Sequence, residues 1–478
     1  MSFPDALKQP KPFYLVFFIE LWERFGYYGM QALIVLYFVK ELKYSDSEAD
    51  HLFAAFAALI YLLPSLGGYI GDRWLGTKNT MIFGTFVLIL GYSYLALAGD
   101  RDIYLPLGII AVGVGLFKAN PASLLSKIYG DDATKLDGGF TLYYMAVNIG
   151  SFFSMALTPI FAGIWGWHVA FGICAIGMCL AMLTYFFMRG LVKVYGSKPD
   201  FQKVTLKTMA SIIVVTGALI LLSAWLLKHY TFSGWLILMG GVVVLCIFLM
   251  EIKKSPANEK RSLILCLILI VQAIIFFVLY LQMPTSLNLF ALRNVEHHLW
   301  GMPIEPASYQ VFNSAWIMIL SPILAMIYNQ LAYKNRDLSI PMKFALGTFC
   351  TGVSFIVLSA GIHWCSHNGI ISGWWVVAFY FFEGAGELLV SALGLAMVSR
   401  FVPQRLMGFT MGSWFLCTSI AGIMAGHVAS LAAVPREITD PVQSMAIYYG
   451  LFIKIGVITI AISLLMAAFV PMLKRLTK

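Results

Sequence analysis

The first apolar run of the sequence carries charged residues where a membrane helix would normally be uncharged. The run extends from about Phe13 to Val39 and contains Glu20, Glu23 and Arg24. It is long enough to cross a bilayer, which takes roughly 20 residues of helix. A lone charge at that depth costs about 3 kcal/mol or more. These side chains must therefore pair with one another, face a watery cavity, or do both.

Helical spacing gathers the polar residues of this run on one face. The residues that share this face at i, i+4, i+7, i+8 and i+11 are Glu20, Arg24, Tyr27, Tyr28 and Gln31. Glu20 lies one turn before Arg24, which is the better order for an ion pair. Glu23 lies on the shoulder of the face. A structural ion pair that fixes helix packing fits this pattern, and so does a proton or substrate site, because buried carboxylates beside a cation have shifted pKa values.

Further apolar runs follow along the whole chain, so the sequence predicts a polytopic, all-α membrane protein. Hydrophobic residues make up 60% and charged residues 12%, whereas soluble chains carry about a quarter charged residues. Runs of this kind must be helices, because lipid offers no partner to a backbone amide. We expect about 14 spans, at residues 13–39, 50–70, 80–98, 104–127, 139–163, 168–190, 206–227, 233–251, 262–291, 311–331, 342–362, 373–400, 407–431 and 446–473.

The net charge of +9 is best understood through its distribution. Most lysines and arginines fall in alternate loops and in the two tails, which predicts that both termini are cytoplasmic. No loop carries an aromatic and basic module, so we expect no nucleic-acid partner. The seven cysteines form no CxxC pair, and we interpret them as packing residues. Four histidines in predicted outer loops have no ligand spacing, so we expect no metal and no cofactor: His297, His298, His363 and His367.

Polar residues inside later spans of the first half are further candidates. Lys118 lies well inside span 104–127. It either extends to the membrane surface or pairs with an anion, for which the glutamates of the first span are the obvious candidates. Asn148 lies one turn after Tyr144 on one face of span 139–163. In mid-membrane it either links helices or contacts a ligand.

The stretch SLGGYIGDRWLGTK, residues 65–78, joins the second and third spans. It resembles the cytoplasmic loop signature of the major facilitator superfamily. Its glycines permit close helix approach, and Asp72 and Arg73 can bond to neighbouring helix ends and latch one closed state. An ordinary charged turn is the alternative.

The second half has its own polar positions. The stretch YLQMPTSLNLF, residues 280–290, places a proline and several polar side chains at membrane depth, which predicts a broken helix that lines a cavity. Glu387 and Ser391 lie one turn apart near the middle of span 373–400. Spans 206–227 and 233–251 contain almost no polar residue, so we expect them to face lipid and carry no site.

Several ordered motifs are similar to those of the proton-dependent oligopeptide transporters, a branch of the major facilitator superfamily. ELWERFGYYG at 20–29 resembles the ExxERFxYYG signature of this family, and FTLYYMAVNIGSF at 140–152 resembles its second signature. The bacterial dipeptide and tripeptide permeases are matched in order by GGYIGDRWLGTKNT, LFKANP, QMPTSLNLFALRNVEH and GELLVSALGLAMV. The resemblance covers essentially the whole chain. It implies two six-helix bundles at 1–190 and 261–478, with a linker and two extra helices at 191–260.

The resemblance also implies proton-driven import of dipeptides and tripeptides across a bacterial inner membrane, by a transporter that we expect to be monomeric. It assigns proton coupling to Glu20, Glu23, Arg24 and Lys118. It implies that the peptide site is lined by Tyr28, Tyr61, Lys118, Asn148, Gln282, Asn313, Glu387, Ser391 and Trp414, and Tyr144 belongs with them through its spacing from Asn148. Arg24 and Lys118 can hold a peptide carboxylate, and Glu387 can hold the ammonium group.

The chain departs from the family pattern at two positions. Many members have an arginine where this chain has Gln31, and many have a glutamate where it has Leu281. In the family these two residues form an outer ion pair, so losing both leaves no orphan charge. Glu383, one turn before Glu387, is an additional acid. It either substitutes for the missing carboxylate or lies in an outer water-filled vestibule.

Two other functions fit the sequence less well. The same fold could move another zwitterion or an anion such as nitrate, but a simple anion has no use for an ammonium partner such as Glu387. A membrane enzyme or a receptor would need a nucleophile–base pair, a metal cluster or a large soluble domain, and the sequence indicates none. We therefore expect a transporter and not an enzyme.

Overall fold

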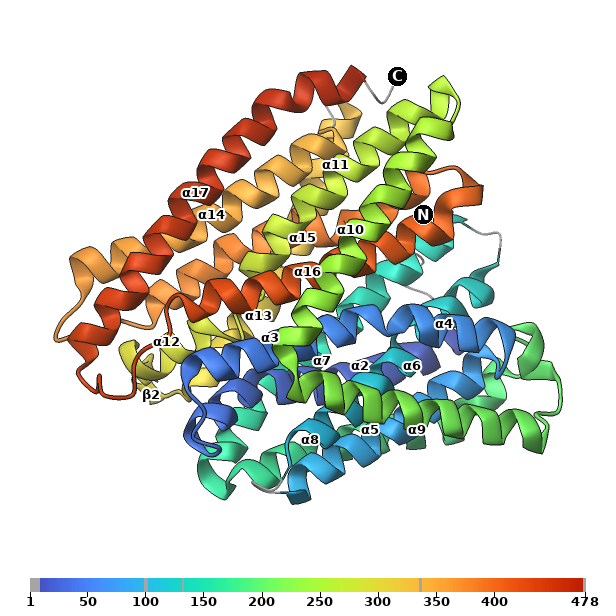
Figure 1. Ribbon diagram of the computed structural model, residues 1–478, viewed down its shortest axis with the longest axis horizontal. Coiled ribbons are helices and arrows are strands. Elements are labelled where there is room, and N and C mark those ends of the chain that lie inside the picture. The colour runs from blue at the N-terminus through green and yellow to red at the C-terminus, as the bar shows by residue number, and fades with distance from the viewer. Residues whose placement is uncertain (1–8, 99–101, 131–132, 335–337, 476–478) are drawn as a thin grey trace. The chain divides into compact units, whose positions relative to one another are not determined.

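The computed structural model describes residues 9–98, 102–130, 133–334 and 338–475, and these are almost entirely helical (Figure 1). The chain groups into two compact units. Unit 1 comprises Met1–Tyr37 and Leu59–Tyr230, and unit 2 comprises Phe38–Ala58 and Thr231–Lys478. Helix α3 (Asp46–Leu62) therefore contributes its first turns to unit 2 and its last residues to unit 1.

Unit 1 is built from long helices joined by short connections. They are α2 (Lys11–Lys40), α4 (Pro64–Arg73), α5 (Thr77–Ala98), α6 (Tyr104–Tyr129), α7 (Ala133–Trp165), α8 (Trp167–Met188) and α9 (Leu206–Lys228), with the short 3₁₀ helices η1 (Arg189–Val192) and η2 (Lys198–Phe201). One of its apolar clusters joins α4, α5, α6 and α9 through Ile70, Leu75, Val87, Val112, Leu116 and Ile212.

Unit 2 contains the remaining helices and one small hairpin. They are α10 (Tyr230–Lys254), α11 (Ala257–Tyr280), α12 (Ser286–Asn294), β1 (His298–Leu299), β2 (Met302–Pro303), η3 (Pro306–Gln310), α13 (Val311–Tyr333), α14 (Ile340–Cys365), α15 (Trp374–Phe401), η4 (Gln404–Leu406), α16 (Met407–Ser430) and α17 (Pro441–Arg475). The two strands pair antiparallel, with Leu299 opposite Met302.

Every predicted span is helical in the structure, and two of the spans are each divided between two helices. Within the described residues, 12 helical segments are long and apolar enough to cross a membrane. Helices α2 and α15 are not among these 12. Helix α2 carries the charged residues Glu20, Glu23 and Arg24 within its apolar run.

Two predicted spans are interrupted in the structure. The span at 50–70 is divided at Leu63, where Pro64 begins α4 in the first-turn position that proline tolerates. The span at 262–291 is divided between α11 and α12 by turns at 281–285, which contain Pro284. This confirms the broken helix that was predicted from the polar stretch at 280–290.

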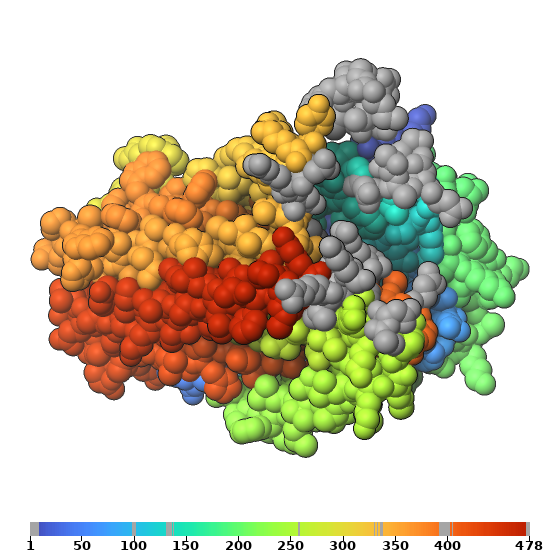
Figure 2. All heavy atoms as spheres, turned by 90° about the horizontal axis from the view of Figure 1, so that it is seen from above, coloured from blue at the N-terminus to red at the C-terminus, as the bar shows by residue number. Residues whose placement is uncertain are grey.

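The two plain helices pack on one face and expose the other. In unit 1, α9 approaches α6 closely, because a Cβ on Gly108 would lie 2.9 Å from the backbone nitrogen of Ala224. In unit 2, Ile237 of α10 packs against Ile423 of α16. The outer faces carry exposed apolar side chains such as Val214 and Met239, and the surface of α10 can be followed in yellow-green in Figure 2. Such faces suit contact with lipid.

Candidate functional site

The charged residues of α2 form a buried cluster around one guanidinium group. The Nε atom of Arg24 lies 3.2 Å from Oε1 of Glu20 and also contacts Oε2 of Glu23. All three side chains are buried. The ring of Tyr27 lies beneath the guanidinium group, with 5.4 Å between the ring centroid and Cζ of Arg24. The predicted pairing of Glu20 with Arg24 is present, and Glu23 joins it.

This cluster is incompletely satisfied. Neither carboxylate oxygen of Glu23 and neither Nε nor Nη2 of Arg24 has a partner in hydrogen-bonding geometry among the described residues. The contacts are therefore ion pairs without well-directed hydrogen bonds. Because a buried charge without full pairing is costly, a proton or a bound anion would relieve this arrangement.

Helix α7 approaches α2 at backbone distance beside this cluster. A Cβ on Gly150 would lie 2.3 Å from the carbonyl oxygen of Leu21 and 3.2 Å from Cβ of Arg24. Only glycine permits this approach. It places the polar face of α7 next to the charges of α2.

One consequence of this approach was not predicted. The Tyr143 hydroxyl forms a hydrogen bond with Glu20. The neighbouring Tyr144 was the predicted residue, because of its spacing from Asn148. The sequence shows two adjacent tyrosines at 143 and 144. The rotation of α7 about its own axis decides which of them faces Glu20.

Lys118 contacts an aromatic ring of unit 1. Its Nζ atom lies 4.6 Å from the ring centroid of Tyr61, another predicted site residue. No carboxylate oxygen lies within ion-pair distance of Lys118 among the described residues, although Glu20, Glu23 and Arg24 are near enough for their charges to act on it. A cation over a ring is stabilised electrostatically and keeps its N–H groups available.

Two other predicted residues of unit 1, Tyr28 and Asn148, lie on α2 and α7. Tyr28 packs edge-on against Tyr27, with 5.2 Å between the ring centroids. Asn148 is buried, and its Nδ2 donates to the carbonyl oxygen of Tyr144, 2.9 Å away within α7. Tyr28 thus lies on the helix that carries the charge cluster, and Asn148 lies on the helix that packs against it.

Unit 2 contains a second buried polar cluster, formed by α13 and α15. Nδ2 of Asn313 donates to Oε2 of Glu383 at 2.6 Å and to Oε2 of Glu387 at 3.0 Å. All three residues are buried. Glu387 and Asn313 were predicted together, and the structure adds Glu383 to them.

The break between α11 and α12 contains Gln282, another predicted residue of unit 2. Gln282 is fully buried, and its Nε2 donates to the carbonyl oxygens of Val278 and Ala425, while its Oε1 accepts from Ser286. It therefore holds the broken helix to α16. Two other candidates lie in this unit: Trp414 of α16 packs edge-on against Phe277 at 6.0 Å, and Ser391 lies one turn after Glu387 on α15.

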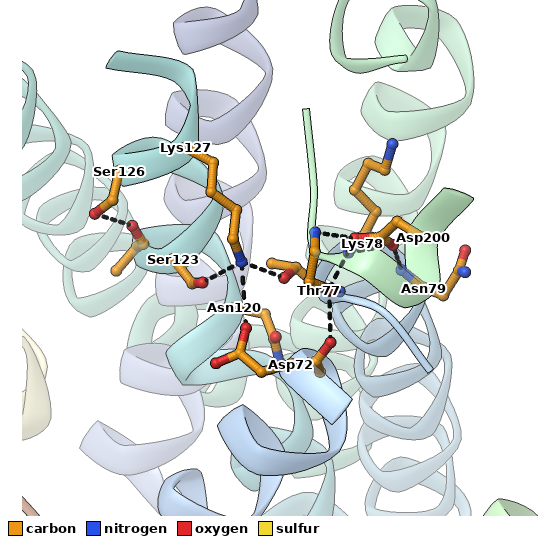
Figure 3. A network of polar contacts seen from close by, with 12 residues as sticks. Asp72, Thr77, Lys78, Asn79, Asn120, Ser123, Ser126, Lys127 and Asp200 are labelled. Atoms are coloured by element: carbon orange, nitrogen blue, oxygen red, sulfur yellow. Dashed lines mark hydrogen bonds and ion pairs between the residues drawn. The ribbon is translucent and has the colours of Figure 1, made fainter. Parts of the chain in front are cut away.

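The loop between α4 and α5 forms a network with α6 and the linker (Figure 3). Nζ of Lys127 lies 3.2 Å from Oδ1 of Asp72 and donates to Thr77 and Ser123. Oδ1 of Asp200 accepts from the backbone nitrogens that begin α5, those of Lys78 and Asn79.

The two proposed latch residues differ in this network. Asp72 belongs to it through Lys127, whereas Arg73 is exposed and takes part in none of the bonds described above. The linker carboxylate Asp200, which was not predicted, caps α5 from more than 100 residues away in sequence.

A second ion pair was also not predicted. Arg293 of α12 makes two bonds to Asp46 at the start of α3, at 2.6 and 2.7 Å, and it donates to the Tyr448 hydroxyl. The backbone nitrogen of Val434 donates to the same carboxylate. The partners are distant in sequence, so no local spacing indicates this pairing.

Among the described residues, no group of three or more His, Cys, Asp or Glu residues is placed to hold a metal ion.

Comparisons with known proteins give consistent results. A family model described as the POT family matches residues 78–448. The chain is 45% identical to dipeptide and tripeptide permease B of Salmonella typhimurium, over 98% of this chain and 96% of the relative. It is 47% identical to dipeptide and tripeptide permease A of the same organism, over 99% of this chain and 94% of the relative.

Solved structures resemble the chain over nearly its full length. A bacterial homologue of the human drug peptide transporters PepT1 and PepT2 superimposes with a TM-score of 0.87 and 39% identity, covering 98% of this chain and 99% of that one. Tetrameric PepTSo2 superimposes with a TM-score of 0.88 and 38% identity, with the same coverage.

Proposed function

The chain belongs to the POT family, and we propose that it is a proton-coupled symporter that imports dipeptides and tripeptides by alternating access. The comparisons confirm the family resemblance and the major facilitator fold that were expected from the sequence, because the relatives are named permeases and the similar structures are peptide transporters. The protein is a multi-pass membrane transporter and not an enzyme. Nothing in the comparisons favours nitrate.

The observation that carries the proposal is the pair of buried polar clusters with complementary chemistry. Unit 1 supplies the cations Arg24 and Lys118, which suit a peptide carboxylate. Unit 2 supplies Glu387 with Asn313, which suits a peptide ammonium group. A zwitterionic peptide needs both ends recognised. A ligand that binds one conformation better than another shifts the population toward that conformation, and this is how substrate can bias alternating access.

The remaining predicted residues complete the proposed site. We assign peptide contacts also to Tyr28, Tyr61, Tyr144, Asn148, Gln282, Asn313, Ser391 and Trp414. Asn148 and Asn313 can bond to the peptide group that every substrate shares, and the aromatic residues form walls that tolerate many side chains. Asp72 and Arg73 are proposed to latch one state at the cytoplasmic side.

Proton coupling is proposed to use the α2 cluster. When Glu20 or Glu23 takes up a proton, it no longer pairs with Arg24, and the guanidinium group becomes available to the peptide carboxylate. When the proton leaves, the ion pair re-forms and competes with the peptide. The incomplete hydrogen bonding of Glu23 and Arg24 supports this exchange, because little directed bonding must be broken.

The proposed setting is the bacterial inner membrane with both termini in the cytoplasm. The proposed organisation is two six-helix bundles at 1–190 and 261–478, with the extra helices at 191–260. We further propose that a single chain is the transporting unit. One similar solved structure is tetrameric, and mass measurement of the protein in nanodiscs distinguishes the two states.

The test is dialanine uptake into proteoliposomes with an imposed inward proton gradient, with and without an uncoupler. We expect uphill uptake that the uncoupler abolishes. Glu23→Gln should lose uphill accumulation and retain some exchange of labelled dialanine, whereas Glu437→Gln, a matched change at an exposed loop residue, should behave as wild type. Full uphill uptake by Glu23→Gln would refute the coupling role, and absence of dialanine movement in wild type would refute the substrate.

A further inference from the structure

A cavity of about 540 Å³ lies between loops of unit 2. Its wall combines the last turn of α2 and the loop that follows, Arg293 of α12, and residues 434–444, which lead into α17. All of these residues belong to unit 2. The volume is typical of small-molecule sites, which measure about 300–1,000 Å³. None of the residues assigned to the proposed peptide site is among its described lining residues, so it is a separate feature of the chain.

Buried polar bonds hold one wall of this cavity in place. The Asp46 carboxylate accepts two bonds from Arg293, at 2.6 and 2.7 Å, and a third from the backbone nitrogen of Val434 at 3.0 Å. These bonds join α3, α12 and the loop before α17. In the same wall, the Ser444 hydroxyl donates to Oδ1 of Asn294 at 3.1 Å. The fold therefore fixes this wall before any ligand arrives, and it pairs the one acid of the described lining.

Two exposed basic residues, Lys43 and Arg436, also line the cavity. Lys43 has a φ of 56°, in the left-handed region that non-glycine residues seldom adopt. The Nη2 atom of Arg436 donates to the carbonyl oxygen of Lys43, which supports this turn and keeps the two residues together. Strained turns persist where the surrounding structure supports them, and they are common at ligand-binding sites. The Lys43 ammonium group donates to the carbonyl oxygen of Lys40 and has two further hydrogens.

The carboxylates near these cations have other roles in the fold. Glu48 lies 3.9 Å from Arg436, but the same oxygen accepts from the backbone nitrogen and the hydroxyl of Ser45, at 2.8 and 2.7 Å, and so caps α3. Asp440 accepts from a backbone nitrogen in the first turn of α17 at 3.0 Å. The other acids of these loops are exposed and are not among the described lining residues: Glu41 and Glu437. The described lining therefore contains three basic residues and one acid that is already paired.

The distribution of charge along the chain makes this positive excess unusual. Under the proposed topology, the loops that form the cavity lie on the outer side of the membrane, where basic residues are depleted. The outer segments expected from the sequence contain few of them: Lys40, Lys43, Arg101, Lys228, Arg293 and Arg436. Three of these six line the one cavity. Membrane topology does not require basic residues to gather on the outer side, whereas binding of an anion accounts for it.

We propose that this cavity binds a small organic oxyanion whose carboxylate or phosphate group is held between Lys43 and Arg436. An ammonium group and a guanidinium fork both suit such oxygens, and the fork can bind two of them at once. A single oxyanion group is a few times larger than a water, which takes about 30 Å³, so the cavity has room for an apolar body against Val434 and Ile438. The site uses none of the residues assigned to peptide transport, so it does not depend on the proposed function.

The test is ligand-observed saturation-transfer NMR on the full-length protein in nanodiscs of zwitterionic lipid, at constant ionic strength. The two probes are N-acetylalanine, which carries a carboxylate, and glycerol 3-phosphate, which carries a phosphate. Their neutral counterparts are N-acetylalaninamide and glycerol. We expect saturable binding of at least one anion and binding of its neutral counterpart that is weaker by about tenfold or more. The anion with the lower Kd shows whether the natural ligand is a carboxylate or a phosphate ester.

The variant Lys43→Gln/Arg436→Gln removes two charge-assisted contacts and should raise the Kd of the bound anion by about 10- to 100-fold. Both side chains are exposed, so the variant should fold. Lys43→Gln alone keeps the bond of Arg436 to the backbone and is the second variant, with a smaller increase in Kd. The matched control is Lys228→Gln, a change at an exposed lysine of unit 1, which should bind as wild type does.

Three results would overturn the proposal. Equal affinity of wild type and the double variant would place the bound anion elsewhere. Equal affinity for an anion and its neutral counterpart would show that charge is not recognised. Absence of binding by both anions would show that the cavity holds neither kind of oxyanion. None of these results depends on dialanine uptake, so the proposed function and this proposal can fail separately.

Discussion

The pairing of Asp46 with Arg293 should be one of the larger single contributions to the stability of unit 2. The pair is bidentate, and the side chains are 3% and 24% exposed, respectively. We consider Arg293→Gln, Asp46→Asn and the double variant. Each single change leaves one member of the pair without its ionic partner in a poorly hydrated position.

The magnitude follows from this burial. Removing one member of a buried ion pair costs about 3–5 kcal/mol. The lower end applies to Arg293→Gln, because Asp46 retains the hydrogen bond from the backbone nitrogen of Val434. The double variant leaves no unpaired charge, so its loss should be well below the sum of the two single losses, with a coupling free energy of about 2 kcal/mol.

The assay is reversible unfolding of the purified protein in mixed micelles of increasing SDS fraction, with the four members of the mutant cycle compared. The matched control is the pair of Glu48 with Arg436. These two side chains are 54% and 64% exposed and lie 3.9 Å apart, and such pairs contribute about 0–1 kcal/mol. Glu48→Gln should therefore unfold almost as wild type does.

Two results would refute this reasoning. If Arg293→Gln and Glu48→Gln lose similar stability, burial does not decide the strength of these pairs. If the double variant loses the sum of the single losses, the two residues act independently and the bidentate contact contributes nothing.

Two further predictions concern close backbone approach and capping. Gly150→Ala places a Cβ 2.3 Å from a backbone oxygen, so it should lower the free energy of unfolding by about 1–3 kcal/mol and reduce dialanine uptake. Gly172→Ala, with open space around it, should be neutral. Equal effects of the two changes in unfolding assays would contradict the packing argument. Asp200→Ala removes the acceptor for the first amides of α5 and should cost about 1–2 kcal/mol, whereas Lys198→Ala on the same short helix should change the free energy of unfolding little. Equal thermal stability of these two variants would show that the cap is unimportant.

The sequence predicts the helices well because the physical signal is local. An apolar run of membrane length has one stable solution in lipid, and every predicted span is helical. The polar stretch around Pro284 also predicts the break between α11 and α12, because proline and polar side chains at membrane depth are incompatible with an uninterrupted lipid-facing helix.

The candidate site is predicted only where its residues share one helix. Glu20 and Arg24 lie one turn apart, and their contact follows from helical geometry alone. The contacts of Tyr143 with Glu20 and of Arg293 with Asp46 join different helices. They depend on helix rotation and on approach distances set by residues such as Gly150, which a single sequence does not reveal.

The two acid clusters show how the partner decides what a buried carboxylate can do. Beside Arg24, an ionised glutamate is compensated, and in the proposed exchange a proton on that glutamate releases a cation that can bind a carboxylate. Beside Asn313, Glu383 accepts from a neutral amide, which compensates a charge less well than a guanidinium group does. The cluster of unit 1 therefore supplies cations, and the cluster of unit 2 supplies carboxylates. Under the proposed function, a zwitterionic peptide presents one group suited to each, whereas a simple anion has no group suited to Glu387.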